Sequence, residues 1–213
     1  MKRRKILGAI AIIIATSFSV NAQSNDSNAE FGVKGGVNFS NMYTEDVDDN
    51  NVLTSFNAGL YVKLPITDMI AIQPELLYSR KGAELSYNNL FATGTAKFKL
   101  NYIELPVLLK LNLTDNFNIH AGPYLAYLVN AQVTNENDNG SLDFENTLDN
   151  EDFNKFDYGV SGGIGFDFDS FSIGARYNYG LQTVGKEQSI GGFTYTVPNG
   201  KNSNLSLYAS IKL

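Results

Sequence analysis

Polar and apolar residues alternate along most of the chain, which is the period of a β-strand. The pattern is clearest over residues 100–129, where two alternating runs flank a short polar break at 112–116. In each run one face is wholly apolar and the other is mixed, because successive side chains of a strand point to opposite sides. Both runs exceed the usual length of about 5–6 residues for a soluble strand. They suit a tilted strand that spans a bilayer, which needs about 9–11 residues.

Six further segments show the same alternation, at about 30–42, 53–64, 69–81, 155–168, 171–181 and 205–213. With the two runs above, they make eight strands. The connections between them are alternately long and short, and the long ones include irregular loops at about 82–96 and 132–154. This alternation is typical of outer-membrane barrels with short periplasmic turns and longer extracellular loops. The sequence therefore predicts an all-β fold, an eight-stranded antiparallel up-and-down transmembrane β-barrel.

Charged and aromatic residues follow the same two-faced pattern. The charged residues of the predicted strands fall opposite the apolar face, as a bilayer requires, since Lys or Arg on the lipid face costs about 2–4 kcal/mol. Aromatic residues of the apolar face gather toward the strand ends, which is typical of interfacial girdles. A soluble barrel of the lipocalin kind would alternate equally well, with its apolar face around a ligand. The girdles and the asymmetric connections favour the membrane barrel.

The N-terminus has the pattern of a secretory signal peptide. Basic residues at 2–5 precede an apolar run at 6–15, and Val20-Asn21-Ala22 resembles a signal-peptidase site. The apolar run is shorter than the roughly 20 residues of a spanning helix, which argues against an uncleaved anchor. We therefore expect a signal peptide over 1–22, a flexible leader over 23–29 and an outer-membrane β-barrel domain over 30–213.

Composition excludes several kinds of chemistry. The chain has no cysteine and one histidine, so it offers no thiolate nucleophile and no metal centre built from several histidines. Residues 23–213 carry 12 basic and 22 acidic residues, a net charge of −10, which disfavours nucleic-acid binding because phosphates would be repelled. The stretch 135–140 (NENDNG) resembles the start of a calcium loop, but the acidic ligand of its twelfth position falls on Asn146. We expect no cofactor and no metal site.

The mixed faces of the strands predict a polar network in the barrel lumen. Its expected members are Lys34, Glu75, Glu104, Lys110, His120, Asp157 and Arg176. The interior of an eight-stranded barrel is just wide enough for side chains to fill it, and a buried charge without a partner is strongly destabilising. These residues are therefore expected to pair and to plug the lumen. The alternative is a gated or solute-binding lumen lined by the same side chains.

His120 is the one candidate for general acid–base catalysis. It follows a short turn, so we expect it inside the barrel near the periplasmic side, away from the outer rim at which small-barrel enzymes act. We expect no catalytic site. Three prolines, Pro74, Pro106 and Pro123, fall within predicted strands of a barrel that has no edge. We expect a β-bulge at each.

Several segments carry a family resemblance across essentially all of the chain after residue 22. They are FGVKGGVNFSNM, IQPELLYSRKGAEL, NYIELPVLLKL, HAGPYLAYLV, FDYGVSGGIGFDF and ARYNYGL. They resemble the PorT-like, "porin family" outer-membrane β-barrel domain. The resemblance implies a small barrel of about eight strands in the cell outer membrane. The founding type of this family is associated with a secretion system for surface and secreted proteins.

These observations together favour a structural or interaction protein of the outer membrane without catalysis. A narrow solute channel is the alternative that the lumen charges suggest, and a component of a protein secretion apparatus is the alternative that the resemblance implies. The expected partners are outer-membrane lipid and an extracellular or envelope protein bound through the long loops. We expect a monomer that binds no nucleic acid.

Overall fold

The computed structural model describes residues 29–43, 50–88, 93–137, 144–147, 153–185, 187–190, 193–196 and 200–213. The predicted signal peptide and residues 23–28 of the predicted leader lie outside these residues. Within the described ranges, no helix is long and apolar enough to cross a membrane.

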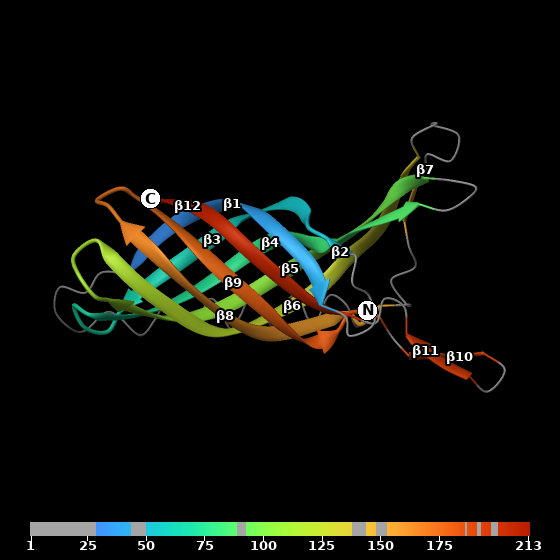
Figure 1. Ribbon diagram of the computed structural model, residues 1–213. Helices are drawn as coiled ribbons and strands as arrows, with labels where there is room; N and C mark the ends of the chain where they lie inside the picture. Colours follow the sequence, from blue (N-terminus) through green and yellow to red (C-terminus); the bar gives the residue numbers. More distant parts are fainter. Residues whose placement is uncertain are drawn as a thin grey trace, which may run out of the picture.

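Eight strands form a closed barrel (Figure 1). They are β1 (Glu30–Tyr43), β3 (Leu53–Pro65), β4 (Ile70–Asn88), β5 (Thr93–Asn112), β6 (Phe117–Asn137), β8 (Phe156–Asp167), β9 (Phe171–Thr183) and β12 (Lys201–Lys212). Each pairs antiparallel with the next, and β12 pairs with β1 to close the ring. The expected fold class, an eight-stranded antiparallel barrel, is confirmed.

Short turns join the strands at one end of the barrel, over 66–69, 113–116 and 168–170. Two of them use the same chemistry. The hydroxyl of Thr67 accepts a hydrogen bond from the backbone N–H of Ile70 at 3.0 Å, and Thr114 accepts one from Phe117 at 3.0 Å. A threonine three residues before the next strand therefore satisfies a backbone donor that the turn would leave open.

The strands β4, β5 and β6 are much longer than the others, with 19, 20 and 21 residues. They project beyond the barrel at the end opposite the short turns (Figure 1). There, β2 (Asn50–Asn51) pairs with β4, and β7 (Phe144–Thr147) pairs with β6. A separate hairpin of β10 (Glu187–Ile190) and β11 (Phe193–Thr196) lies at the same end.

The sequence predicts irregular loops over 82–96 and 132–154, and this prediction is wrong for much of both segments. Residues 82–88 and 93–96 continue the β4–β5 hairpin, and 132–137 continue β6. These segments are polar and leave the bilayer, so neither lipid nor a lumen imposes alternation on them. Ladder hydrogen bonds between neighbouring strands hold them extended.

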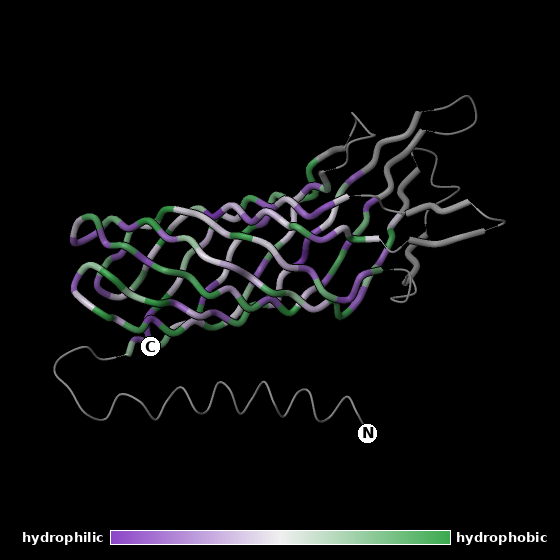
Figure 2. Tube along the Cα trace, turned by 90° about the horizontal axis from the view of Figure 1, so that it is seen from below, coloured by the Kyte–Doolittle hydropathy of each residue, from purple (hydrophilic) through white to green (hydrophobic). Residues whose placement is uncertain are grey.

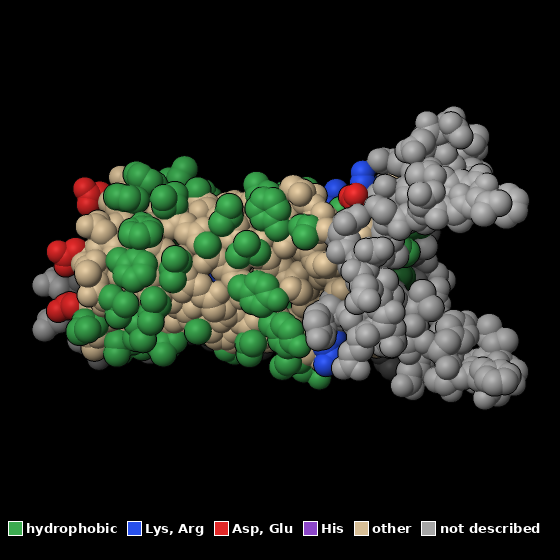
Figure 3. All heavy atoms as spheres, viewed as in Figure 1, with side chains coloured by type: hydrophobic (Ala, Val, Ile, Leu, Met, Phe, Trp, Pro, Cys, Tyr) green, Lys and Arg blue, Asp and Glu red, His purple; other side chains and the backbone are tan. Residues whose placement is uncertain are grey.

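The two faces of the wall differ as the alternation predicts. Hydrophilic and hydrophobic residues alternate along the strands (Figure 2), and apolar side chains form a band on the outer surface (Figure 3). Phe56, Ile164 and Leu207 on that surface are 45%, 46% and 49% exposed. Lys34, Glu75, Glu104 and Arg176 point inward and are buried. The outer face is thus suited to lipid and the inner face to a polar core.

The expectation of bulges at the prolines is wrong. Register shifts occur in the described strands only between Asn101 and Tyr102 and between Lys201 and Ser203. Each proline lies instead at a short gap in one ladder: Pro74 between β3 and β4, Pro106 between β4 and β5, and Pro123 between β5 and β6. The register is the same on both sides of each gap. The missing N–H donor of proline therefore interrupts the ladder for a few residues without shifting the strands against each other.

Candidate functional site in the barrel lumen

A carboxylate at mid-depth holds the two walls of the barrel together. Glu75 on β4 and Arg176 on β9 lie on strands separated by three others in either direction around the ring. The Arg176 nitrogens Nη1 and Nη2 donate to Oε2 and Oε1 of Glu75 at 2.7 and 2.8 Å. A bidentate pair of this kind is both strong and geometrically specific. It crosses the lumen from wall to wall.

Two further groups complete the shell of this carboxylate. Lys34 on β1 donates to Oε1 and Oε2 of Glu75 at 3.0 and 3.3 Å, and the amide of Gln73 donates to Oε1 at 2.8 Å. The side chains of Lys34, Glu75 and Arg176 are 2%, 0% and 3% exposed. We call these three residues the central cluster. The Glu75 carboxylate is therefore engaged by donors from three strands, at the depth where the lipid-facing band surrounds the lumen.

Aromatic and imidazole rings pack against the central cluster. The Lys34 ammonium lies 3.5 Å from the centroid of the Tyr208 ring, and the Arg176 guanidinium lies 5.4 Å from it. Such contacts stabilise cations that have left water. Arg176 Nε donates to Nε2 of His120 at 3.4 Å, and Nδ1 of His120 lies 3.1 Å from Oδ1 of Asn118. Because Nε2 of His120 accepts a hydrogen bond and Nδ1 faces an acceptor, the network assigns to His120 the neutral tautomer with its proton on Nδ1.

A belt of amides and hydroxyls lies beyond the central cluster. Asn57 Nδ2 donates to Oδ1 of Asn38 at 2.6 Å and to Oγ of Ser206 at 2.8 Å, and Asn204 Nδ2 donates to the same Asn38 oxygen at 3.2 Å. Asn38 Nδ2 in turn donates to Ser79 Oγ at 3.2 Å. The void between this belt and the central cluster measures about 10 Å³, which is at most one water molecule.

A second ionic group lies nearer the outer end of the lumen. Lys81 pairs with Glu104 and lies 4.4 Å from the centroid of the Tyr124 ring. Asp157 accepts hydrogen bonds from Asn202 Nδ2 at 2.9 Å and from the Tyr124 hydroxyl at 3.3 Å. In their ordinary ionic forms, Lys81, Glu104 and Asp157 carry one net negative charge and the central cluster one net positive charge. The two groups are therefore neutral together, as a low-dielectric interior favours.

An apolar cap covers the lumen above this second group. Phe153 and Val184, 4% and 3% exposed, come from the connections before β8 and after β9. They belong to one buried cluster with Met42, Leu100 and Leu128 of the strands, and Phe153 forms an isolated β-bridge with Gly185. Sequence reasoning missed the cap. One signal of it in the sequence is Phe153, an aromatic residue near the end of the strongly acidic segment 132–154.

The short-turn end of the lumen is open. A polar cavity of about 280 Å³ lies there, with Lys110 paired to Asp167 at 2.8 Å on its wall. At its mouth, Glu30 pairs with Lys212 at 3.3 Å and with Lys63 at 3.6 Å.

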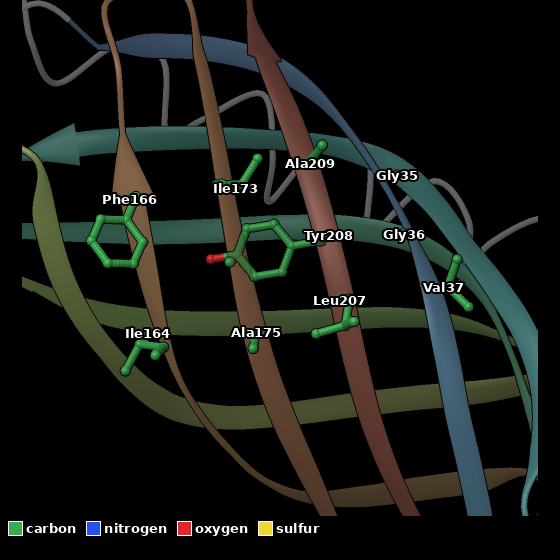
Figure 4. A pocket seen from close by; sticks show the side chains of 11 residues that line it. Gly35, Gly36, Val37, Ile164, Phe166, Ile173, Ala175, Leu207, Tyr208 and Ala209 are labelled. Carbon is green, nitrogen blue, oxygen red and sulfur yellow. The ribbon is translucent and has the colours of Figure 1, made fainter.

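A different hollow, of about 550 Å³, lies on the outer wall over β1, β12, β9 and β8 (Figure 4). Small residues such as Gly35, Ala175 and Ala209 leave this hollow in the lipid-facing surface.

The structure brings four of the seven predicted network residues together: Lys34, Glu75, His120 and Arg176. The other three have separate partners. Glu104 and Asp157 belong to the outer ionic group, and Lys110 lies at the open mouth. Sequence reasoning missed Gln73, Tyr208 and the asparagine belt, because neutral side chains give no charge signal. Their positions in the alternation place them on the inner face. Within the described part of the chain, no three His, Cys, Asp or Glu side chains are placed to hold a metal ion.

The chain matches the model of a protein family described as "Outer membrane protein beta-barrel domain" over residues 21–184. None of the curated proteins compared with the chain matches it. Ail, the attachment invasion locus protein of Yersinia pestis, has a similar structure at 10% identity and a TM-score of 0.48, covering 87% of this chain and 99% of that chain. Neisserial surface protein A matches at 16% identity and a TM-score of 0.46, with the same coverage of 87% and 99%. An outer membrane channel from Pseudomonas putida F1 matches at 11% identity and a TM-score of 0.31, covering 91% and 98%. At these identities the similarity is one of fold alone, and the roles of these proteins are not transferred to this chain.

Proposed function

The chain belongs to the outer membrane protein beta-barrel domain family and is a closed β-barrel of the outer membrane, and on that premise we propose a role that needs no open lumen. In this proposal it serves as a structural or interaction protein that conducts no solute and catalyses no reaction. The observation that carries the proposal is the wall-to-wall pair of Glu75 and Arg176. Opening the lumen would require this carboxylate to give up two cations at once, and an unpaired buried charge is costly.

Three features of the lumen support closure over conduction. The central cluster, the amide belt and the apolar cap lie in series between the short-turn mouth and the outer end. A permeating ion would have to displace all three. His120 supports the absence of catalysis, because both of its ring nitrogens have partners inside the lumen and its ring is buried.

The projecting ends of β4, β5 and β6 support the interaction role. A rigid barrel that extends its sheet beyond the membrane presents connecting segments to partners outside the cell, where binding residues concentrate on loops held by a scaffold. The segment 132–154 contains seven acidic and no basic residues. We therefore propose a protein partner with a basic surface, bound by the barrel as a monomer.

Conductance across planar bilayers tests the proposal. The purified protein should give no stable, ion-selective current at any voltage at which a general porin, inserted by the same procedure, conducts steadily. Discrete current steps would contradict it, provided that their ion selectivity changes in the Arg176→Gln variant, which would place the path in the lumen.

Two alternatives each have one supporting feature. The open cavity at the short-turn end favours a narrow channel, and solute uptake that depends on the protein would support that reading. The PorT-like resemblance favours a component of a protein secretion apparatus. Recovery of a stable complex of envelope proteins with the tagged barrel, from detergent-solubilised native membranes, would support the secretion reading.

A further inference from the structure

The two ends of the barrel differ in the charges that they expose. Each short turn carries one exposed acidic residue: Asp68, Asp115 and Asp169. Basic side chains lie where the apolar band ends, toward the projecting strands, with an acidic side chain among them (Figure 3). The short turns mark the periplasmic side, so the basic residues lie at the level of the outer-leaflet headgroups.

Two of these cations share the outward face of β4 and β5. Arg80 alternates with the lipid-facing Leu76 and Tyr78 along β4, so it points outward. Arg80 is in register with Asn101 on β5, and Lys99 lies two residues from Asn101 on the same face. Arg80 and Lys99 are therefore diagonal neighbours, at a spacing of roughly 7–8 Å.

The contacts of Arg80 hold its guanidinium at the edge of the apolar band. Nε donates to Oδ1 of Asn101 at 2.8 Å, and the guanidinium carbon lies 5.4 Å from the centroid of Phe56, a lipid-facing ring. Lys99 is held by a neutral partner too, since its Nζ donates to Thr134 Oγ1 at 2.9 Å. Among the contacts described for this part of the chain, neither cation is paired with a carboxylate. The terminal nitrogens of Arg80 and two protons of Lys99 thus remain for an external anion.

The residues that follow Arg80 on this face of β4 are Gly82 and Glu84. Gly82 stands opposite Lys99 in the β4–β5 ladder and is buried, and Glu84 is partly exposed and in register with Lys97. On the neighbouring strand β6, Asn130 pairs in register with Asn101, and Gln132 with Lys99. Both β6 side chains are partly exposed and offer amides next to the cations. The surface therefore combines a phosphate-binding pair with hydrogen-bonding groups suited to a sugar.

We propose that Arg80 and Lys99 bind a phosphate group of a phosphorylated glycolipid in the outer leaflet, with Asn130 and Gln132 facing its sugar. Arginine binds phosphate through two parallel N–H donors, and lysine adds a point charge. The lipid source follows from position, because Phe56 continues the apolar band directly beneath Arg80. A soluble polyanion would meet the net charge of −10 carried by residues 23–213, whereas a lipid is confined to the membrane plane beside the pair.

Binding of lipid A tests this proposal, measured by native mass spectrometry on the detergent-solubilised barrel in EDTA. We expect the wild-type protein to prefer diphosphorylated lipid A over the same lipid without phosphates. The double variant Arg80→Gln/Lys99→Gln should bind about 25-fold more weakly, at about fivefold for each cation. The matched control, Lys63→Gln/Lys212→Gln, removes two cations from the short-turn mouth and should bind as the wild type does.

Three results would overturn the proposal. The first is equal affinity of the wild-type protein for both lipids, and the second is equal lipid A affinity of the Arg80→Gln/Lys99→Gln and Lys63→Gln/Lys212→Gln variants. The third is displacement of the lipid by millimolar inorganic phosphate, which would identify a site for free phosphate. Each variant is first shown to be folded by its mobility on a denaturing gel without heating. If the double Gln variant does not fold, the charge-retaining variant Arg80→Lys/Lys99→Arg and the single variants Arg80→Gln and Lys99→Gln are measured in its place. The charge-retaining variant should bind within a few-fold of wild type and each single Gln variant about fivefold more weakly.

Discussion

Glu75 and Arg176 lie on strands diametrically opposite in the barrel and form a bidentate salt bridge, with nitrogen–oxygen distances of 2.7 and 2.8 Å. Most contacts of a small barrel join adjacent strands, which share a ladder. This pair joins β4 to β9 through the lumen. It therefore ties the proposed closure of the lumen to the stability of the barrel, and the variants below separate these two effects.

Removing the carboxylate of the central cluster should strongly destabilise the barrel. Glu75→Ala leaves Lys34 and Arg176 buried without an anion, and breaking a buried pair costs about 3–5 kcal/mol. The measurement is the urea concentration at which the folded band disappears from an unheated denaturing gel. Lys212→Ala is the control, because it breaks a partly exposed pair with Glu30 and should cost only about 0–1 kcal/mol. Equal midpoints for the two variants would show that the central cluster is solvated.

Replacing the whole central cluster by apolar residues should restore that loss in full. In the triple variant Lys34→Met/Glu75→Leu/Arg176→Met no charge of the central cluster itself is left without a partner, and well-packed apolar replacements of buried ionic clusters are often neutral or stabilising by about 1–4 kcal/mol. We expect a urea midpoint at or above that of the wild type, and bilayers that stay non-conducting. A urea midpoint of the triple variant below that of Glu75→Ala would instead show that the ionic interactions themselves stabilise the barrel.

The number of strands could be predicted from the sequence because two solvents act on opposite faces. Lipid forbids charge at positions such as Leu207, and the lumen accepts it at positions such as Arg176, so alternation is enforced along every spanning segment. The ends of β4, β5 and β6 could not be predicted in this way. Beyond the bilayer both faces are polar, the alternation vanishes, and only pairing with the neighbouring strand holds residues such as Lys97 and Lys99 extended.

The composition of the lumen could be predicted, but its pairing could not. Alternation assigns Lys34, Glu75 and Arg176 to the inner face, yet their depth depends on how far each strand is staggered around the ring. No local pattern reports that stagger. The apolar cap was missed for a related reason, since Phe153 lies in a connection that has no period to reveal its direction.

A charge on the lipid face should be costly at mid-strand and tolerated near the outer end. Leu207 lies near the middle of β12 and is 49% exposed, so Leu207→Arg should cost about 2–4 kcal/mol in a bilayer. Ser203 lies on the same face near the outer end, and Ser203→Arg should cost less than about 1 kcal/mol there. Urea unfolding from phospholipid vesicles compares the two. If both variants unfold together, Leu207 does not face the hydrocarbon.

A methyl group at Gly82 should weaken the base of the projecting strands. Gly82 has φ +151°, which L side chains rarely adopt, and a Cβ there would lie 1.8 Å from the carbonyl oxygen of Phe98. Gly82→Ala should therefore cost about 1–3 kcal/mol, read as a lower urea midpoint and as faster proteolysis in the β4–β5 hairpin. Gly162→Ala is the matched control, because its Cβ would meet no atom within 4 Å, and it should change stability by less than about 1 kcal/mol. Since Gly82 stands opposite Lys99, the substitution should also weaken lipid A binding, whereas Gly162→Ala should not. Unchanged protease resistance in the Gly82 variant would mean that the hairpin tolerates a different backbone at this position.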